Sequence, residues 1–88
     1  MKYSERQVQA VADQFKRKIE SGEYNGPEAA VALIAMAKSG RLSQENCEYI
    51  IKYAYAGNEL EAMTILSRAR HMINENQINE IASEVAPD

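Results

Sequence analysis

The chain has 88 residues, of which 45% are hydrophobic and 26% are charged, which excludes a disordered chain and predicts one domain, 1–88, with a modest core. Its net charge of −3 disfavours nucleic-acid partners, because phosphate backbones repel acidic surfaces. The single cysteine excludes an internal disulfide, and the longest apolar run, residues 29–37, is half of a membrane span, so we expect a cytoplasmic protein without membrane contact.

A capping motif marks the start of the first predicted helix. Ser4 is followed three residues later by Gln7, and in such a capping box each side chain accepts a hydrogen bond from the other residue's backbone N–H. Apolar residues then recur at spacings of three and four: Val8, Val11, Phe15 and Ile19. This spacing predicts a helix over residues 5–20 that ends at Ser21 and Gly22.

The second predicted helix, over residues 27–39, is apolar all round. Pro27 stands at its first position, where the missing N–H costs least. Nine apolar residues then follow without interruption from Ala29 to Ala37. A helix without a polar face is normally enclosed by neighbours, so we expect this helix to be central.

The third predicted helix, over residues 44–56, carries two flanks. Gly40 is suited to close the preceding helix, and Ser43 to cap this one. Tyr49 and Tyr53, four residues apart, lie along a flank that is a candidate for exposure. The other flank is the predicted core stripe, formed by Cys47, Ile50, Ile51 and Ala54.

Two further helices are predicted over residues 59–73 and 77–85. Gly57 closes the third helix, and Asn58 caps the fourth, with Glu61 in the reciprocal capping position. The wide apolar face of the fourth helix includes Leu60, Met63, Leu66 and Ile73. Together the five segments predict an all-α fold, a compact bundle or hairpin stack of four to five short helices.

Residues 46–69 resemble a tetratricopeptide-like helical hairpin. The resemblance rests on an aromatic residue, a turn glycine, a small residue, a bulky apolar residue and an alanine in that family's order: Tyr53, Gly57, Ala62, Leu66 and Ala69. It implies a protein-binding groove between stacked helices and no active site.

No residue pattern in the chain indicates catalysis or a metal site. A nucleophile needs a neighbouring base, and the only histidine, His71, lies 24 residues from Cys47. Folding could still bring the two together, but a buried thiol and a solvated histidine near a helix end explain these residues better. Two nitrogen or sulfur ligands also fall short of a zinc site. We therefore predict a protein that is not an enzyme and needs no cofactor.

The functional prediction is based on tyrosines and glutamates. Tyr49 and Tyr53 suit an interface, since tyrosine is enriched there, although their rings could instead cover the core with the hydroxyls in water. The carboxylates near them are Glu45, Glu48, Glu59 and Glu61. We predict that these six residues bind another protein. A small acidic stoichiometric inhibitor, of the kind phages use against host defences, is one form of such a module.

Two further predictions concern assembly and an alternative partner. The last three predicted helices carry more methionine, tyrosine and isoleucine than a small core hides, which favours a homodimer. The alternative function is a small dimeric DNA-binding transcriptional regulator. It would use Lys52, or the end of the fourth helix with Arg68, Arg70 and His71, against an unfavourable net charge.

Overall fold

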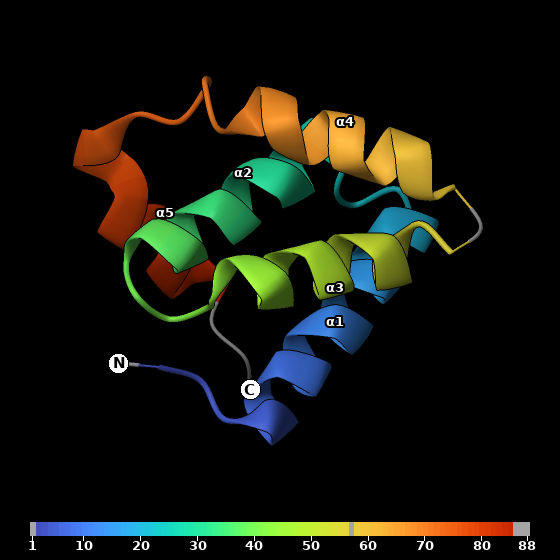
Figure 1. Ribbon diagram of the computed structural model, residues 1–88, viewed down its shortest axis with the longest axis horizontal. Helices are drawn as coiled ribbons and strands as arrows, with labels where there is room; N and C mark the ends of the chain where they lie inside the picture. Colours follow the sequence, from blue (N-terminus) through green and yellow to red (C-terminus); the bar gives the residue numbers. More distant parts are fainter. Residues whose placement is uncertain (1, 57, 86–88) are drawn as a thin grey trace.

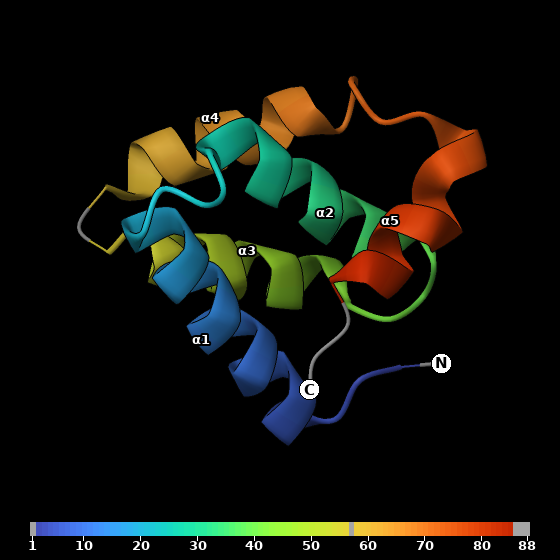
Figure 2. The same cartoon turned by 180° about the vertical axis from the view of Figure 1, so that it is seen from behind.

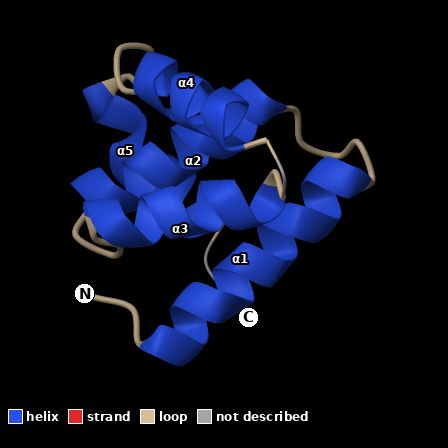
Figure 3. Cartoon of the chain, turned by 45° about the vertical axis from the view of Figure 1, so that its right-hand side comes forward, coloured by secondary structure: helices blue, strands red, loops and turns tan. Residues whose placement is uncertain are grey.

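Helices supply all the regular structure in the part of the chain that the computed structural model describes, residues 2–56 and 58–85. They are α1 (Glu5–Glu20), α2 (Gly26–Lys38), α3 (Gln44–Ala54), α4 (Glu59–Ala69), the short 3-10 helix η1 (Glu75–Gln77) and α5 (Ile78–Glu84) (Figure 1). The segments between them are loops and turns (Figure 3). The predicted all-α bundle is confirmed.

Side-chain caps fix where the first two helices begin. Ser4 Oγ accepts from the Gln7 N–H at 3.2 Å, and Gln7 Oε1 accepts from the Ser4 N–H at 2.9 Å, so the predicted capping box is confirmed. Asn25 Oδ1 caps α2 with a 2.9 Å bond from the N–H of the third helical residue. This cap starts α2 at Gly26, one residue before the predicted start at Pro27.

Two helices end at least two residues earlier than their apolar spacing predicts. α3 ends at Ala54 in place of residue 56, and the predicted turn at Gly57 lies outside the described residues. α4 ends at Ala69 in place of residue 73, because the N–H groups of His71 and Met72 donate to carbonyls three residues back, at 3.1 and 3.0 Å. Such bonds form a tighter turn than the α-helix, while apolar residues continue through it.

The helices pack in an interleaved order. α1 makes its most extensive contacts with α3, whereas α2 lies against α4 and α5 (Figure 1, Figure 2). α3 also contacts α2 and α4, and so joins the two groups. The predicted central position of α2 is confirmed, since seven of its 13 residues are buried and it contacts all four of the other α-helices.

The core draws on every long helix. Its largest fully buried side chains are Phe15, Leu33, Met36, Ile50, Ile51 and Leu66. The predicted core stripe of α3 is confirmed, with Cys47 and Ala54 also buried. The radius of gyration is 11.5 Å, close to the value of about 12 Å expected for a compact chain of this length. None of the described helices combines the length and the apolar character that crossing a bilayer requires.

The predicted apolar face of α4 is wrong in part. Leu60 is 81% exposed, and Met72, beyond the helix end, is 65% exposed. The buried side of α4 is formed by Ala62, Leu66 and Ala69. Because each helical residue turns by about 100°, Leu60 lies on nearly the opposite side from Ala62. The small alanines let α4 approach α2 closely, and they decide which of its apolar residues are buried.

Candidate functional site

The predicted tyrosine flank of α3 lies beside α1. Tyr49 Oη donates to Gln9 Oε1 at 2.7 Å, and Tyr53 Oη donates to Asp13 Oδ1 at 2.9 Å. Gln9 Nε2 in turn donates to the same Asp13 oxygen at 3.1 Å. The two tyrosine rings are 6.0 Å apart between centroids. The flank is therefore a polar network that joins α3 to α1.

Tyr53 serves this helix contact more than the open surface. The hydrogen bond to Asp13 is the main cause that raises the pKa of the Tyr53 phenol. The Lys16 ammonium also lies over the Tyr53 ring, 5.0 Å from its centroid, which is within the range of a cation–π interaction. The ring is partly buried, so only part of its surface faces outward.

Tyr49 lies in the middle of an outward surface of α3. Its side chain remains 45% exposed despite the hydrogen bond to Gln9. Glu45 precedes Tyr49 by four residues and Glu48 precedes Lys52 by four, so each pair is adjacent on the helix surface. We call Glu45, Glu48, Tyr49 and Lys52 the α3 outer face. The buried stripe that holds Cys47 and Ile50 lies on the other side of the helix.

An ion pair extends the α3 outer face onto α4. Lys52 Nζ lies 2.9 Å from Glu59 Oε1. The hydrogen bond to Glu59 and the charge of its carboxylate raise the pKa of Lys52, with a smaller contribution from Glu48. Glu48 and Glu59 therefore both act on one lysine, although both ends of the ion pair remain in contact with solvent. Such a pair adds little stability, but it fixes the local charge pattern.

The four predicted carboxylates do not converge on one point. Glu45 lies in the first turn of α3, about 14 Å along the helix axis from its end. Glu61 accepts a hydrogen bond from the Asn58 side chain. Burial, and then the charge of Glu61, raise the pKa of Tyr55, so this carboxylate acts on the residue that caps α3. The site therefore places Glu48 and Glu59 beside Lys52, and Glu45 one helical turn before Tyr49, with Glu61 apart.

Sequence reasoning missed the α1 side of this network. Gln9 and Asp13 are four residues apart and lie beside the buried residues Val8 and Ala12. That spacing signals a local pair on the helix surface. It does not say which helix packs there, because the partners lie 40 residues away in the sequence.

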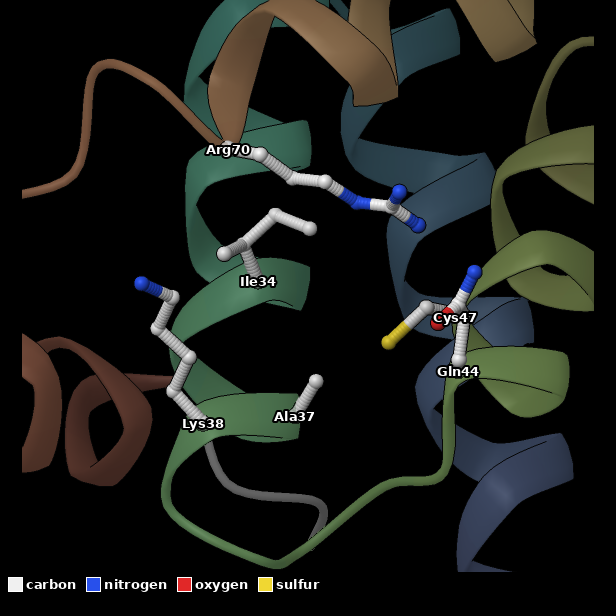
Figure 4. Close-up of a pocket in the computed structure, with 6 residues that line it drawn as sticks. All are labelled: Ile34, Ala37, Lys38, Gln44, Cys47 and Arg70. Atoms are coloured by element: carbon white, nitrogen blue, oxygen red, sulfur yellow. The ribbon is translucent and has the colours of Figure 1, made fainter.

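Cys47, the single thiol, lines a cavity on the other side of α3. The cavity has a volume of about 290 Å³ and is lined by Ile34, Ala37, Lys38, Gln44, Cys47 and Arg70 (Figure 4). Cys47 Sγ donates to the Leu33 carbonyl at 3.4 Å. Burial raises the pKa of the Cys47 thiol to about 12, and since the thiolate is the reactive form, this cysteine is a poor nucleophile at neutral pH.

His71 is exposed. Within residues 2–56 and 58–85, no group of three or more His, Cys, Asp or Glu side chains could hold a metal ion.

No protein-family model, curated protein or solved structure matches the chain. The tetratricopeptide resemblance of residues 46–69 stays a prediction.

Proposed function

We propose that the chain is a non-enzymatic protein-binding module, and that the α3 outer face is its contact surface. The observation that carries this proposal is the position of Tyr49, which is 45% exposed, oriented by a hydrogen bond and surrounded by charged residues. Tyrosine offers a large contact area with few rotatable bonds. The ring is therefore suited to act as an anchor in a partner's surface.

The network under Tyr49 supports binding because it limits the motion of the side chain before contact. The 2.7 Å bond to Gln9 Oε1 fixes the hydroxyl, and the Tyr53 ring packs beside it. Immobilising a free side chain on binding costs about 0.5–1.5 kcal/mol. An anchor that is already held avoids part of this cost.

The charge of the surface favours a basic partner. Glu45, Glu48 and Glu59 supply three negative charges, and Lys52 offsets one of them through its bond to Glu59. Complementary charge accelerates association and selects partners. By covering a basic surface, the module would act as a stoichiometric inhibitor of whatever that surface binds. Tyr53 and Glu61 have supporting positions in this proposal: Tyr53 packs beside Tyr49, and Glu61 acts on Tyr55.

Two matched double variants test the proposal. Glu45→Lys/Glu48→Lys reverses the charge of the α3 outer face, and Glu80→Lys/Glu84→Lys makes the same change in charge at exposed positions of α5. Each tagged protein, together with Tyr49→Ala, is used to capture partners from a lysate of the cells that produce it. Circular dichroism checks that each variant keeps its helices.

The expected result is one stoichiometric protein partner that the wild type and the α5 variant retain. The α3 variant and Tyr49→Ala should each lose it. Equal retention by all four proteins would refute the surface assignment. Nucleic acid as the sole captured species would favour the alternative of a DNA-binding regulator, with Arg68, Arg70 and His71 exposed at the end of α4.

Self-association is a separate part of the proposal. The α3 outer face is acidic, so two copies would repel each other there. Leu60, at 81% exposure, is the more suitable contact for a second copy. We expect light scattering at micromolar concentration to give a dimer for the wild type and for Met72→Ser, and a monomer for Leu60→Ser. A monomeric wild type would refute the proposed self-association.

A further inference from the structure

The cavity beside Cys47 combines an apolar floor with a positive rim. Ile34 and Ala37 come from α2, and Cys47 comes from α3 with its sulfur turned toward them (Figure 4). Arg70 extends across the opening from the end of α4, and Lys38 reaches up from the end of α2 (Figure 4). Elements distant in sequence thus converge on one small space.

The floor of this cavity is electrically neutral. The Cys47 S–H is engaged with the Leu33 carbonyl at 3.4 Å, and burial keeps the thiol protonated at neutral pH. Ile34 and Ala37 contribute only hydrocarbon. A ligand group that fits here is therefore apolar, because a polar group would lose its hydrogen bonds to water.

The two charged residues that line the cavity are cations, Arg70 and Lys38, while the carboxylates of Glu48 and Glu75 lie near it. Arg70 makes no ion pair with any residue among those the structure describes, and its guanidinium is the charge that most opposes the upward shift of the Cys47 pKa. Lys38 Nζ lies 3.9 Å from Glu75 Oε1, with the Lys38 side chain 38% and the Glu75 side chain 82% exposed, so this pair is weak. Arg70 is thus the cation best placed to receive an anion, and its planar guanidinium suits a carboxylate.

We propose that this cavity binds a small monocarboxylate, with its short apolar group against Ile34, Ala37 and Cys47 and its carboxylate on Arg70. The volume of about 290 Å³ lies at the lower limit of small-molecule sites, which span roughly 300–1,000 Å³. A short-chain acid fits this limit, whereas a nucleotide or a long acyl chain does not. The site adjoins the α3 outer face at one point, because Gln44, which lines the cavity, precedes Glu48 by four residues. Its other lining residues come from α2, the buried stripe of α3 and the end of α4, away from Tyr49.

The test uses three probes of equal length and two arginine variants. Hexanoate, hexanol and hexylamine are each titrated into ¹⁵N-labelled protein, and the amide shifts of Ile34, Ala37 and Cys47 are followed. Arg70→Gln removes the rim cation. Arg68→Gln is the matched control, because Arg68 lies two residues away and lines a different cavity, formed with Pro27, Ile65, Ala69 and Met72. Both arginines are exposed, so both variants should fold.

We expect saturable shifts with hexanoate and about fivefold weaker binding of hexanol, the size of effect that one solvent-exposed charge pair gives. Arg70→Gln should weaken the binding of hexanoate by the same factor without changing the affinity for hexanol. Arg68→Gln should change neither affinity. Ala37→Met, which fills the cavity, should abolish the shifts from both probes. The proposal is overturned if hexanol or hexylamine binds as tightly as hexanoate, if Arg70→Gln leaves the affinity for hexanoate unchanged, or if no probe binds.

Discussion

Gly26 is the position where a single methyl group should disturb the packing of three helices. It is the first residue of α2, and the side chains of Tyr55, which caps α3, and of Ile65 on α4 close over it. A Cβ atom added to Gly26 would lie 2.5 Å from Tyr55 Oη and 2.9 Å from Ile65 Cδ1. Atoms do not pack this closely, so Gly26→Ala must push one of these side chains away.

The two effects of Gly26→Ala have opposite signs. Alanine is favoured over glycine inside a helix by up to about 1 kcal/mol, and less at a first position. Overpacking a filled site costs about 1–3 kcal/mol. We expect the free energy of unfolding to fall by about 1–2 kcal/mol, which for a chain of this size lowers Tm by about 4–8 °C per kcal/mol.

Removing the Tyr55 hydroxyl should relieve most of this loss. In Gly26→Ala/Tyr55→Phe, the nearest side-chain atom is Ile65 Cδ1, at the end of a flexible chain, and Tyr55 Cζ is 3.5 Å from the added Cβ. Urea denaturation of the wild type, both single variants and the double variant gives the coupling energy between the two positions. We expect the double variant to be about 1 kcal/mol more stable than the sum of the two single effects, because part of the overpacking cost is removed.

Gly22→Ala is the control for this cycle. Nothing lies within 4 Å of its added Cβ, but its φ of +81° is unfavourable for alanine. It should lose stability that Tyr55→Phe does not restore. A Gly26→Ala variant as stable as the wild type would show that the added methyl group is accommodated without overpacking. If the full loss of stability persists in the Tyr55→Phe background, the Tyr55 hydroxyl is not its cause.

Three further predictions follow from local contacts. Ser4→Ala removes one bond of the capping box with Gln7 and should cost about 1 kcal/mol in urea denaturation; an unchanged midpoint would show that α1 does not depend on this cap. The Cys47 thiol has an ordinary pKa of 9.0 and a folded pKa of about 12, so the native state keeps a proton that the unfolded chain loses above pH 9. This contribution is complete below pH 9 and falls by up to roughly 4 kcal/mol as the pH rises to 12; urea denaturation at pH 7, 9 and 10.5 should show a flatter profile for Cys47→Ala, and parallel profiles would contradict it. Asp13→Asn should lower the pKa of Tyr53 toward its usual range, because the carboxylate that accepts its hydrogen bond is lost; an NMR titration that gives the same pKa in both proteins would contradict the assigned cause.

The helices of this chain are predictable from local signals. Ser4 and Ser43 mark two starts, Gly40 adopts the left-handed conformation expected of it at φ +83°, and apolar spacing identifies the buried stripe of α3. These features depend on residues a few positions apart. The end of α4 was harder to predict, because apolar residues such as Met72 continue past Ala69 while the backbone tightens into a turn.

The surfaces are less predictable, because they depend on which helices meet. Tyr49 and Tyr53 were correctly placed on one flank, but their partners Gln9 and Asp13 belong to a helix distant in sequence. Leu60 has the residue type of a core position and yet faces outward, since the buried side of α4 is decided by its alanines. The cavity under Arg70 draws on α2, α3 and the segment after α4, and no single stretch of sequence contains it.

The interleaved packing of α1 with α3 and of α2 with α4 has a consequence for how the chain reaches its fold. Among the described residues, none of the α-helices makes its most extensive contacts with the next one along the chain. The hydrogen bonds between α1 and α3 join residues 40 positions apart, so a large loop must close before they form. Folding should therefore be a single concerted step over most of the chain, and a fragment of residues 44–69 alone, although it contains both α3 and α4, should stay unfolded in water.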